Sequence, residues 1–254
     1  MNVTAWKFAR KQRPAAAVRP GSRVYAIGDI HGRLDLLERL HDTIEQELFA
    51  APGTPEIEVV YLGDYVDRGP DSKAVIDLLL RNRLADAKII TLLGNHEQAL
   101  LAFLEKPESG AGWIYYGGDA TLASYGISID PMAPRSKELL ASYAERLRRA
   151  MPAEHLEFLK ALALRHENGD YLFVHAGVDP KRPLDQQDKL DLIWIREAFT
   201  ESAKFCGKVV VHGHTITAEP VVRANRIGID TGAYVSGRLT CLVLEGTERR
   251  FLTT

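Results

Sequence analysis

The stretch RVYAIGDIHGRLDLLERLHDTIEQELF (residues 23–49) contains a short apolar run, a Gly-Asp break and then apolar residues at helical spacing. This order predicts a β-strand, a loop and an amphipathic α-helix. The same order recurs in IEVVYLGDYVDRGPDSKAVIDLLLRNRL (residues 57–84) and in AKIITLLGNHEQALLAFLE (residues 87–105). Three consecutive strand–helix units predict an α/β fold built on a largely parallel sheet with crossover helices.

Three glycine-containing motifs follow the predicted strands directly: GDIHG (residues 28–32), GDYVDRG (63–69) and GNHE (94–97). Parallel sheets bind their ligands at the carboxyl ends of the strands. Glycine lets the backbone turn sharply at such a strand end and lets a ligand approach where a Cβ atom would block it. The motifs therefore predict a binding site at one edge of the sheet.

Length and composition predict one large domain. The chain has 254 residues, of which 46% are hydrophobic, so it can bury a substantial core. We assign residues 1–20 to a flexible basic leader and residues 21–254 to the domain. A segment at about 106–166, rich in glycine and aromatic residues and then in helical pattern, is predicted to be a helical insertion.

Charge and cysteine content exclude some classes of protein. The 32 basic and 34 acidic residues give a net charge of −2, which is not the footprint of a nucleic-acid-binding protein. No apolar run approaches the length of a membrane span. Cys206 and Cys241 are far apart and in no paired spacing, so we expect a reducing, cytoplasmic location and neither a disulfide framework nor a thiolate metal site.

The second half of the chain contains closely spaced strand candidates. They are YLFVHAG (171–177), KVVVHGH (208–214), RIGIDTG (226–232) and RLTCLVLEG (238–246). Short strands separated by turns predict a more antiparallel second half. Two facing sheets would accommodate both halves of the chain.

Potential metal ligands stand just past several of the predicted strands. Six carry oxygen or nitrogen donors: Asp29, His31, Asp64, Asn95, His175 and His214. Carboxylate, imidazole and amide donors without thiolate suit Mn²⁺, Fe²⁺ or Zn²⁺. Six donors exceed what one open catalytic ion requires, whereas two ions about 3.5–4 Å apart, bridged by a carboxylate, are a common device for phosphoester hydrolysis.

Other residues near these donors suggest transition-state chemistry. His96 follows Asn95 directly, so its imidazole is a candidate proton donor to a leaving alkoxide. Asp67 is placed to orient that imidazole and raise its pKa. Arg68 and Arg196 are candidates for binding the phosphate oxygens, since a planar guanidinium binds them in pairs.

Several residues keep alternative interpretations. An Asp or Asn beside Gly is more often a turn residue than a functional one. His212 lies two residues before His214, and its direct contact with a metal is left open. Glu97 is interpreted as an acidic residue that begins a helix, and YYGGD (115–119) is either a substrate wall or a glycine-rich loop. The other histidines are predicted to lie on solvated faces: His41, His155 and His166.

The five blocks GDIHG, GDYVDRG, GNHE, HAG (175–177) and HGHT (212–215), in this order, resemble the signature blocks of the calcineurin-like metallophosphoesterases, in their phosphoprotein phosphatase branch. LIWIRE (192–197) is similar to the matching stretch of compact bacterial and bacteriophage serine/threonine protein phosphatases of the phage lambda type. The resemblance implies a four-layer α/β/β/α sandwich with a helical insertion.

The resemblance also implies roles for single residues. It implies a dinuclear centre in which Asp64 bridges two divalent ions, preferably Mn²⁺, with Fe²⁺ or Zn²⁺ as alternatives. One ion would be held by Asp29, His31 and Asp64, and the other by Asp64, Asn95, His175 and His214. His96 would be the general acid paired with Asp67, and Arg68 and Arg196 would bind phosphate.

Our main functional hypothesis is a metal-dependent phosphomonoesterase, a serine/threonine protein phosphatase in which a metal-bridging hydroxide attacks phosphorus in line. Its substrate would be a phosphorylated protein or a small phosphoester, with no nucleic-acid or membrane partner; the oligomeric state stays open. The alternative is a bis(5'-nucleosyl)-tetraphosphatase or a capped-RNA hydrolase of the same superfamily. A third hypothesis, a non-catalytic scaffold with this fold, predicts an eroded ligand set, whereas this chain has all six candidate ligands.

Overall fold

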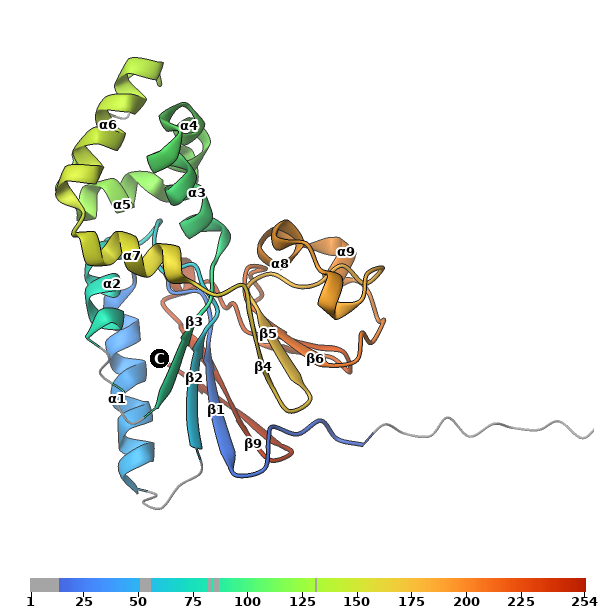
Figure 1. The fold of residues 1–254 in the computed structure, drawn as a ribbon. Helices are drawn as coiled ribbons and strands as arrows, with labels where there is room; N and C mark the ends of the chain where they lie inside the picture. Colours follow the sequence, from blue (N-terminus) through green and yellow to red (C-terminus); the bar gives the residue numbers. More distant parts are fainter. Residues whose placement is uncertain (1–13, 51–55, 82–83, 85–86, 131) are drawn as a thin grey trace, which may run out of the picture.

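The computed structural model describes residues 14–50, 56–81, 84, 87–130 and 132–254. The strands of these residues form two sheets that face each other (Figure 1). The first sheet has the order β10-β9-β1-β2-β3 and consists of β1 (Ser22–Ile27), β2 (Glu56–Tyr61), β3 (Lys88–Thr91), β9 (Thr240–Glu245) and β10 (Glu248–Thr253). The second has the order β4-β5-β6-β8-β7 and consists of β4 (Arg165–Asn168), β5 (Tyr171–Val174), β6 (Val209–His212), β7 (Val221–Val222) and β8 (Arg226–Gly228).

The pairing of the first three strands confirms the predicted parallel sheet. β1 pairs with β2 in parallel, with Tyr25 opposite Val59, and β2 pairs with β3 in parallel. The prediction of a more antiparallel second half is confirmed by the pairs β4–β5, β7–β8 and β9–β10, although β5, β6 and β8 pair in parallel. The last two strands form an antiparallel hairpin that pairs with β1 and so joins the first sheet. Turn spacing in the sequence reveals a local hairpin but not the sheet that it joins.

Helices lie on the outer faces of the two sheets, which confirms the expected four layers. Figure 1 shows α1 and α2 on one side of the first sheet, with the second sheet on the other side and α8 and α9 beyond it. The α-helices of the described residues are α1 (Leu34–Ala50), α2 (Ser72–Leu80), α3 (Asn95–Glu105), α4 (Gly110–Trp113), α5 (Asp119–Ser124), α6 (Lys137–Ala150), α7 (Ala153–Ala161), α8 (Lys189–Trp194), α9 (Glu197–Thr200) and α10 (Ala233–Ser236). Short helical segments of other kinds accompany them: the 3₁₀ helices η1 (Pro107–Ser109) and η3 (Leu184–Gln186) and the π-helical turn η2 (Ile114–Gly118). Among the described helices, none combines the length and the apolar character that crossing a bilayer would require.

Both faces of the first sheet are buried, and alternate residues serve the two faces. In β1, Tyr25 and Ile27 pack toward the helices, whereas Val24 and Ala26 pack toward the second sheet. Side chains alternate between the faces of a strand, so an uninterrupted apolar run fills two hydrophobic cores at once. The predicted strand of residues 23–27 is therefore a central strand.

The segment before β1 packs against the far end of the sandwich from the glycine motifs. It belongs to the stretch predicted to be a leader, of which residues 1–13 lie outside the described residues. Val18 is buried between the sheets, and the Arg19 guanidinium lies 2.7 Å from the buried Glu58 carboxylate. Residues 18 and 19 are therefore part of the packed structure.

The three histidines predicted to be solvated are instead packed. His41 is buried against the Tyr61 hydroxyl, 2.8 Å away, and His155 is buried between Tyr125 and Asp77. His166 is half-buried on β4, where its imidazole contacts the Glu58 carboxylate at 2.7 Å. The prediction failed because each ring finds a polar partner from another element, which allows a histidine to be buried.

Candidate metal centre

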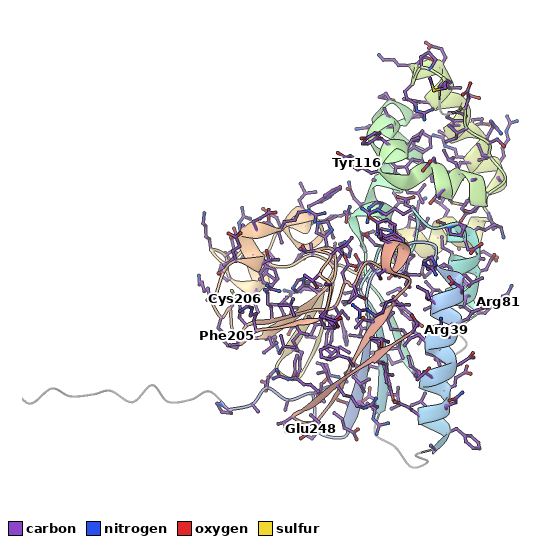
Figure 2. All side chains as sticks on the ribbon, turned by 180° about the vertical axis from the view of Figure 1, so that it is seen from behind. Arg39, Arg81, Tyr116, Phe205, Cys206 and Glu248 are labelled. Atoms are coloured by element: carbon purple, nitrogen blue, oxygen red, sulfur yellow. The ribbon has the colours of Figure 1, made fainter. Side chains whose placement is uncertain are left out.

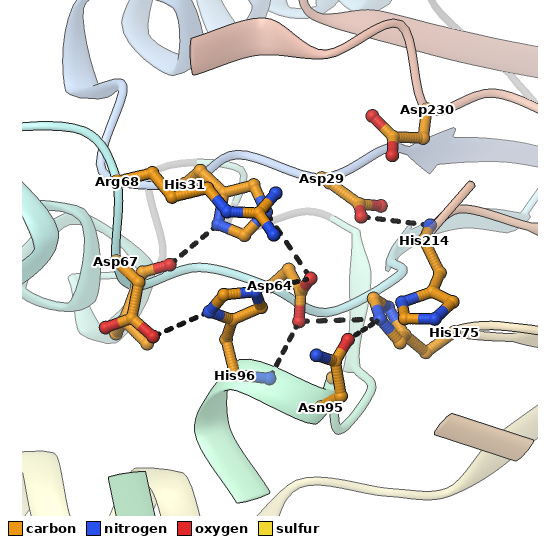
Figure 3. A network of polar contacts seen from close by, with 12 residues as sticks. Asp29, His31, Asp64, Asp67, Arg68, Asn95, His96, His175, His214 and Asp230 are labelled. Atoms are coloured by element: carbon orange, nitrogen blue, oxygen red, sulfur yellow. Dashed lines mark hydrogen bonds and ion pairs between the residues drawn. The ribbon is translucent and has the colours of Figure 1, made fainter. Parts of the chain in front are cut away.

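The carboxyl ends of five strands meet at one edge of the sandwich. β1, β2 and β3 lead to Asp29, Asp64 and Asn95, while β5 and β6 lead to His175 and His214. The two sheets are joined there, because the backbone N–H of His214 donates to Asp29 Oδ2 at 2.9 Å (Figure 3). Side chains far apart in the sequence are thus brought to one place, as the strand–loop pattern predicted.

Asp64 lies at the centre of this cluster (Figure 3). Its Oδ2 atom is 3.4 Å from His31 Nε2, and its Oδ1 atom is 3.4 Å from His175 Nε2. Two groups of potential ligands share Asp64. One contains His31, Asp64 and His96, the other Asp64, His175 and His214, and the donor atoms of each group lie within 4.8 Å of one another.

The histidine tautomers point lone pairs at the Asp64 carboxylate. His31 Nδ1 lies 2.8 Å from the Val66 carbonyl and His175 Nδ1 lies 2.9 Å from the Leu62 carbonyl, so each Nδ1 carries the proton. Each Nε2 atom then presents a lone pair toward an oxygen of Asp64. Acceptor atoms that face one another across about 3.4 Å repel unless a cation lies between them.

Other buried atoms of the cluster lack a hydrogen-bond partner. Among the described residues, Asp29 Oδ1 and His214 Nε2 are buried with none. Burial lowers the pKa of His31 to about 3 and the pKa of His214 to about 2, which keeps both imidazoles neutral, the form that binds metal. Burial, together with the carboxylates of Asp230 and Asp64, raises the pKa of Asp29. Neutral imidazoles and closely spaced carboxylates are suitable ligands for divalent cations.

The backbone at this edge is strained. In the described part of the chain, the non-glycine residues with positive φ are five, and all belong to these loops: His31 (46°), Asp64 (53°), Asp67 (73°), Arg68 (67°) and His214 (62°). A left-handed conformation costs a non-glycine residue about 1–2 kcal/mol. Such strain persists only where surrounding contacts impose it, and it is typical of functional sites.

Two glycines give Asp64 and Asp29 room. A Cβ atom on Gly94 would lie 2.1 Å from Asp64 Oδ1, and one on Gly213 would lie 1.9 Å from Asp29 Oδ1. Both distances are far below van der Waals contact. The glycines of GNHE and HGHT therefore allow backbone and carboxylate to approach closely.

His96 and Asp67 form a buried pair beside the cluster. His96 Nδ1 lies 2.6 Å from Asp67 Oδ2, and His96 Nε2 lies 4.0 Å from Asp64 Oδ2 (Figure 3). Burial disfavours a charge on His96, but the carboxylates of Asp64 and Asp67 outweigh it and raise its pKa above the usual value. The geometry leaves Nε2 of a protonated imidazole facing the centre.

The two arginines lie on different sides of the centre. Arg68 is half-buried, with one guanidinium nitrogen 3.0 Å from His31 Nε2 and its Cζ atom 4.7 Å from the centre of the Tyr234 ring. Arg196 is exposed and donates to the His214 carbonyl at 3.3 Å. The structure thus brings both predicted arginines to the rim of the cluster.

His212, left open in the sequence, lies away from the two ligand groups. Its Nδ1 atom bonds the Gly213 carbonyl at 3.0 Å, and its Nε2 atom is 3.2 Å from the Arg226 guanidinium. The ring also packs edge-on against Phe199. His212 therefore fills a structural position behind the strand end.

Asp230 is a site residue that the sequence reasoning missed. It follows β8 and is buried beside Asp29 (Figure 3), and its Oδ1 atom accepts a hydrogen bond from the Gly232 backbone at 2.9 Å. Burial raises the pKa of Asp230 to about 6. The segment RIGIDTG has the strand–Asp–Gly order of the other motifs, and that order was the available signal.

Glu97 does more than begin a helix. Its Oε1 atom accepts from the backbone N–H groups of Tyr65 (2.7 Å) and Val66 (3.2 Å). Its Oε2 atom accepts from those of Asp64 (2.9 Å) and Gly94 (3.1 Å). One buried carboxylate thus fixes the loop that carries Asp64, and only a tertiary structure could reveal this contact.

Glu97→Ala is expected to lower the free energy of unfolding by at least about 3 kcal/mol, because four buried N–H groups lose their acceptor at once. Urea unfolding of the metal-free protein measures this. Glu105→Ala is the matched control, since Glu105 is exposed near the other end of the same helix. Equal stability of the two variants would contradict the assigned role of Glu97.

A two-sheet α/β sandwich with buried imidazoles and carboxylates at its strand ends is the arrangement of a metal-dependent hydrolase. The model of the calcineurin-like phosphoesterase family matches residues 22–237, and the chain belongs to that family. It is therefore a phosphoesterase of a family that uses divalent metal ions, and its described residues include candidate ligands for them.

The similar proteins include serine/threonine-protein phosphatases and bis(5'-nucleosyl)-tetraphosphatases. The chain is similar to serine/threonine-protein phosphatase 2 of Escherichia coli, with 28% identity over 85% of this chain and 90% of that protein. It is also similar to the asymmetrical bis(5'-nucleosyl)-tetraphosphatase PrpE of Oceanobacillus iheyensis, with 27% identity over 86% and 87%. The symmetrical bis(5'-nucleosyl)-tetraphosphatase of Dechloromonas aromatica is 33% identical over 62% of this chain but only 44% of that protein.

Among solved structures, a cold-active protein tyrosine phosphatase has the same fold. Its TM-score is 0.59 at 21% identity, over 93% of this chain and 81% of that one. This similarity supports the arrangement of the two sheets and their flanking helices.

Proposed function

We propose that the chain is a phosphomonoesterase that removes phosphate from phosphoserine and phosphothreonine side chains, with two divalent cations at the cluster around Asp64. The observation that carries the proposal is the pair of histidine lone pairs directed at the two oxygens of this one carboxylate. Such an arrangement needs positive charge on both sides of Asp64.

The ligand sets we propose share Asp64. His31 and Asp29 complete one set, because His31 Nε2 faces Asp64 Oδ2 and the unpartnered Asp29 Oδ1 is buried nearby. The second set adds Asn95, His175 and His214, whose donor atoms gather near Asp64 Oδ1. Bound divalent cations supply charge for phosphate oxygens and make water a nucleophile at neutral pH.

The chain's own residues would handle the leaving group and the phosphate. His96 would donate its Nε2 proton to the leaving oxygen, with Asp67 holding the other ring nitrogen. Arg68 and Arg196 would bind the non-bridging phosphate oxygens from two sides of the cluster. In the metal-loaded enzyme, Arg68 would exchange its contact with His31 Nε2 for phosphate.

Manganese is the cation that we propose, with Fe²⁺ or Zn²⁺ as alternatives, because nitrogen and carboxylate donors without thiolate accept all three. We further propose a cytoplasmic location, supported by two cysteines that form no disulfide with each other. Under this proposal the partners are phosphorylated proteins rather than nucleic acids or membranes.

The first test is hydrolysis of p-nitrophenyl phosphate with and without added Mn²⁺. We expect turnover that depends on the metal and is lost on chelation, because Arg68 and Arg196 could bind phosphate without cations but could not make water a nucleophile at neutral pH. Absence of turnover of any phosphoester in Mn²⁺ would instead support the non-catalytic scaffold.

Substrate class is a separate question, because the similarity to PrpE, which spans 87% of that protein, favours a second candidate, hydrolysis of diadenosine tetraphosphate. Comparison of kcat/KM on a phosphoserine peptide and on diadenosine tetraphosphate decides between them. We expect the peptide to be the better substrate. A higher value for the dinucleotide would replace the main proposal with the second one.

A further inference from the structure

The helical insertion contacts the loop that carries Asp67 and Arg68. Trp113, at the end of α4, donates its indole Nε1–H to Asp67 Oδ2 at 2.8 Å. Thr121, in α5, donates its hydroxyl to Asp67 Oδ1 at 2.5 Å. Both donors lie more than forty residues after Asp67 in the chain, so the insertion supplies these contacts.

These contacts leave the Asp67 carboxylate no freedom to rotate. His96 Nδ1 also binds Oδ2, at 2.6 Å, so both oxygens accept hydrogen bonds from fixed donors. Asp67 and Thr121 are fully buried and Trp113 is 5% exposed, so water cannot easily replace any of them. A fixed acceptor fixes the imidazole, because His96 must keep its Nδ1–H on Asp67 and its Nε2 toward the centre.

The insertion also holds the strained backbone of this loop. The Asp67 N–H lies 2.9 Å from Thr121 Oγ1 and 3.0 Å from Ser72 Oγ, and the Arg68 N–H donates to the Gly117 carbonyl at 3.0 Å. Asp67 and Arg68 are consecutive left-handed residues, a conformation that requires outside support. Three groups of the insertion and α2 provide that support.

The glycines of YYGGD explain how the insertion approaches so closely. Gly117 has φ 113°, and a Cβ atom on it would lie 2.8 Å from the Arg68 backbone nitrogen. A Cβ atom on Gly118 would lie 2.4 Å from the Trp113 ring, which stacks on Phe103 with 4.8 Å between ring centres. The tyrosines of the same turn point outward: Tyr116 is 66% exposed (Figure 2). The segment YYGGD (115–119), whose role the sequence left open, therefore packs closely against both Trp113 and Arg68 through its two glycines.

We propose that Trp113 and Thr121 are positioning residues for leaving-group protonation: by holding Asp67, they aim the Nε2–H of His96 at the leaving oxygen. In this step a water-derived oxygen forms a bond to phosphorus while the P–O bond of the ester breaks. The electron pair of the broken bond passes to the leaving oxygen, and the Nε2 proton of His96 moves there, which leaves a neutral imidazole. The proposal rests on the proposed role of His96 as general acid. It assigns the insertion a part in the chemical step.

The test compares two esters of similar size, p-nitrophenyl phosphate and phenyl phosphate, in the full-length Mn²⁺-loaded enzyme. p-Nitrophenolate is a stable anion that needs little help from an acid, whereas phenolate is much more basic. For Thr121→Val and for Trp113→Phe, we expect kcat on phenyl phosphate to fall about 10- to 100-fold, and at least about tenfold more than kcat on p-nitrophenyl phosphate. KM should change little.

Conservative variants separate positioning from packing. Thr121→Ser keeps the hydroxyl and should stay within about threefold of wild type on both esters. Tyr115→Phe is the matched control on the same turn, since Tyr115 is 82% exposed. In NMR spectra of the metal-free protein, where no paramagnetic Mn²⁺ broadens nearby signals, the downfield Nδ1–H signal of His96, identified by its loss in His96→Asn, should move in Thr121→Val and stay in place in Thr121→Ser.

Three outcomes would overturn the proposal. They are an equal loss on both esters, a Thr121→Ser variant as slow as Thr121→Val, and an unmoved His96 signal in Thr121→Val. Any of these in an active enzyme overturns the positioning role alone. A wild-type protein that hydrolyses neither ester would refute the proposed function as well, so the two failures are distinguishable.

Discussion

Asp64→Asn is expected to lower kcat for p-nitrophenyl phosphate by about 10³-fold or more. The substitution keeps the size of the side chain but removes the charge that both proposed ligand sets share. Cations that stabilise a phosphoryl transition state contribute several kcal/mol, and about 4 kcal/mol corresponds to 10³ in rate. The loss should be the largest of any single substitution in the site.

Metal content gives a second readout that does not depend on activity. After equilibration with Mn²⁺ and gel filtration, wild type should retain two ions per chain by mass spectrometry, and Asp64→Asn should retain fewer. Asp185→Asn makes the same chemical change at an exposed position and should match wild type in metal and rate. An Asp64→Asn protein with full metal content and full activity would refute the shared-carboxylate arrangement.

The positions of the candidate ligands followed from local patterns in the sequence. A parallel sheet places the ends of its strands at one edge, so Asp29, Asp64 and Asn95 were expected to meet. The structure brings them together, with His175 and His214 arriving from the facing sheet. Each of these residues lies within two positions of a glycine just after a strand-like apolar run, and this pattern can be recognised in the sequence.

The supporting contacts could not be predicted in this way, because they join residues distant in sequence. The hydrogen bonds from Trp113 and Thr121 to Asp67 depend on how the insertion folds back over α2. Glu97 binds backbone atoms some thirty residues earlier, and no periodicity reports that. Each buried polar atom finds its own hydrogen-bond partner in the folded chain, whereas the periodicity of a sequence indicates only which face of a helix or strand is apolar.

Some misassigned residues did carry a signal. His41 lies one turn from Leu37 and Ile44, both buried on the inner stripe of α1, so helical spacing would have placed it inside. His155 similarly lies four residues before the buried Leu159. The error was to let the polarity of histidine outweigh its position on the helix.

His96→Asn is expected to lower kcat about 10²- to 10³-fold on phenyl phosphate while the metal content stays at the wild-type level. The imidazole makes its strongest contact with Asp67, at 2.6 Å, and its Nε2 atom is 4.0 Å from Asp64, so its loss removes the proton donor and leaves the proposed ligands in place. A change at Asp64 should instead affect both metal content and rate.

The solvent deuterium isotope effect on kcat distinguishes a lost proton donor from general damage to the site. Wild type should show the effect, because a proton moves as the leaving group departs, and His96→Asn should lose it. If His96→Asn kept the wild-type rate and isotope effect, the proton would come from elsewhere. If it lost metal together with activity, His96 would be a metal ligand rather than a proton donor. This is the main competing explanation, because His96 belongs to the same group of potential ligands as His31 and Asp64.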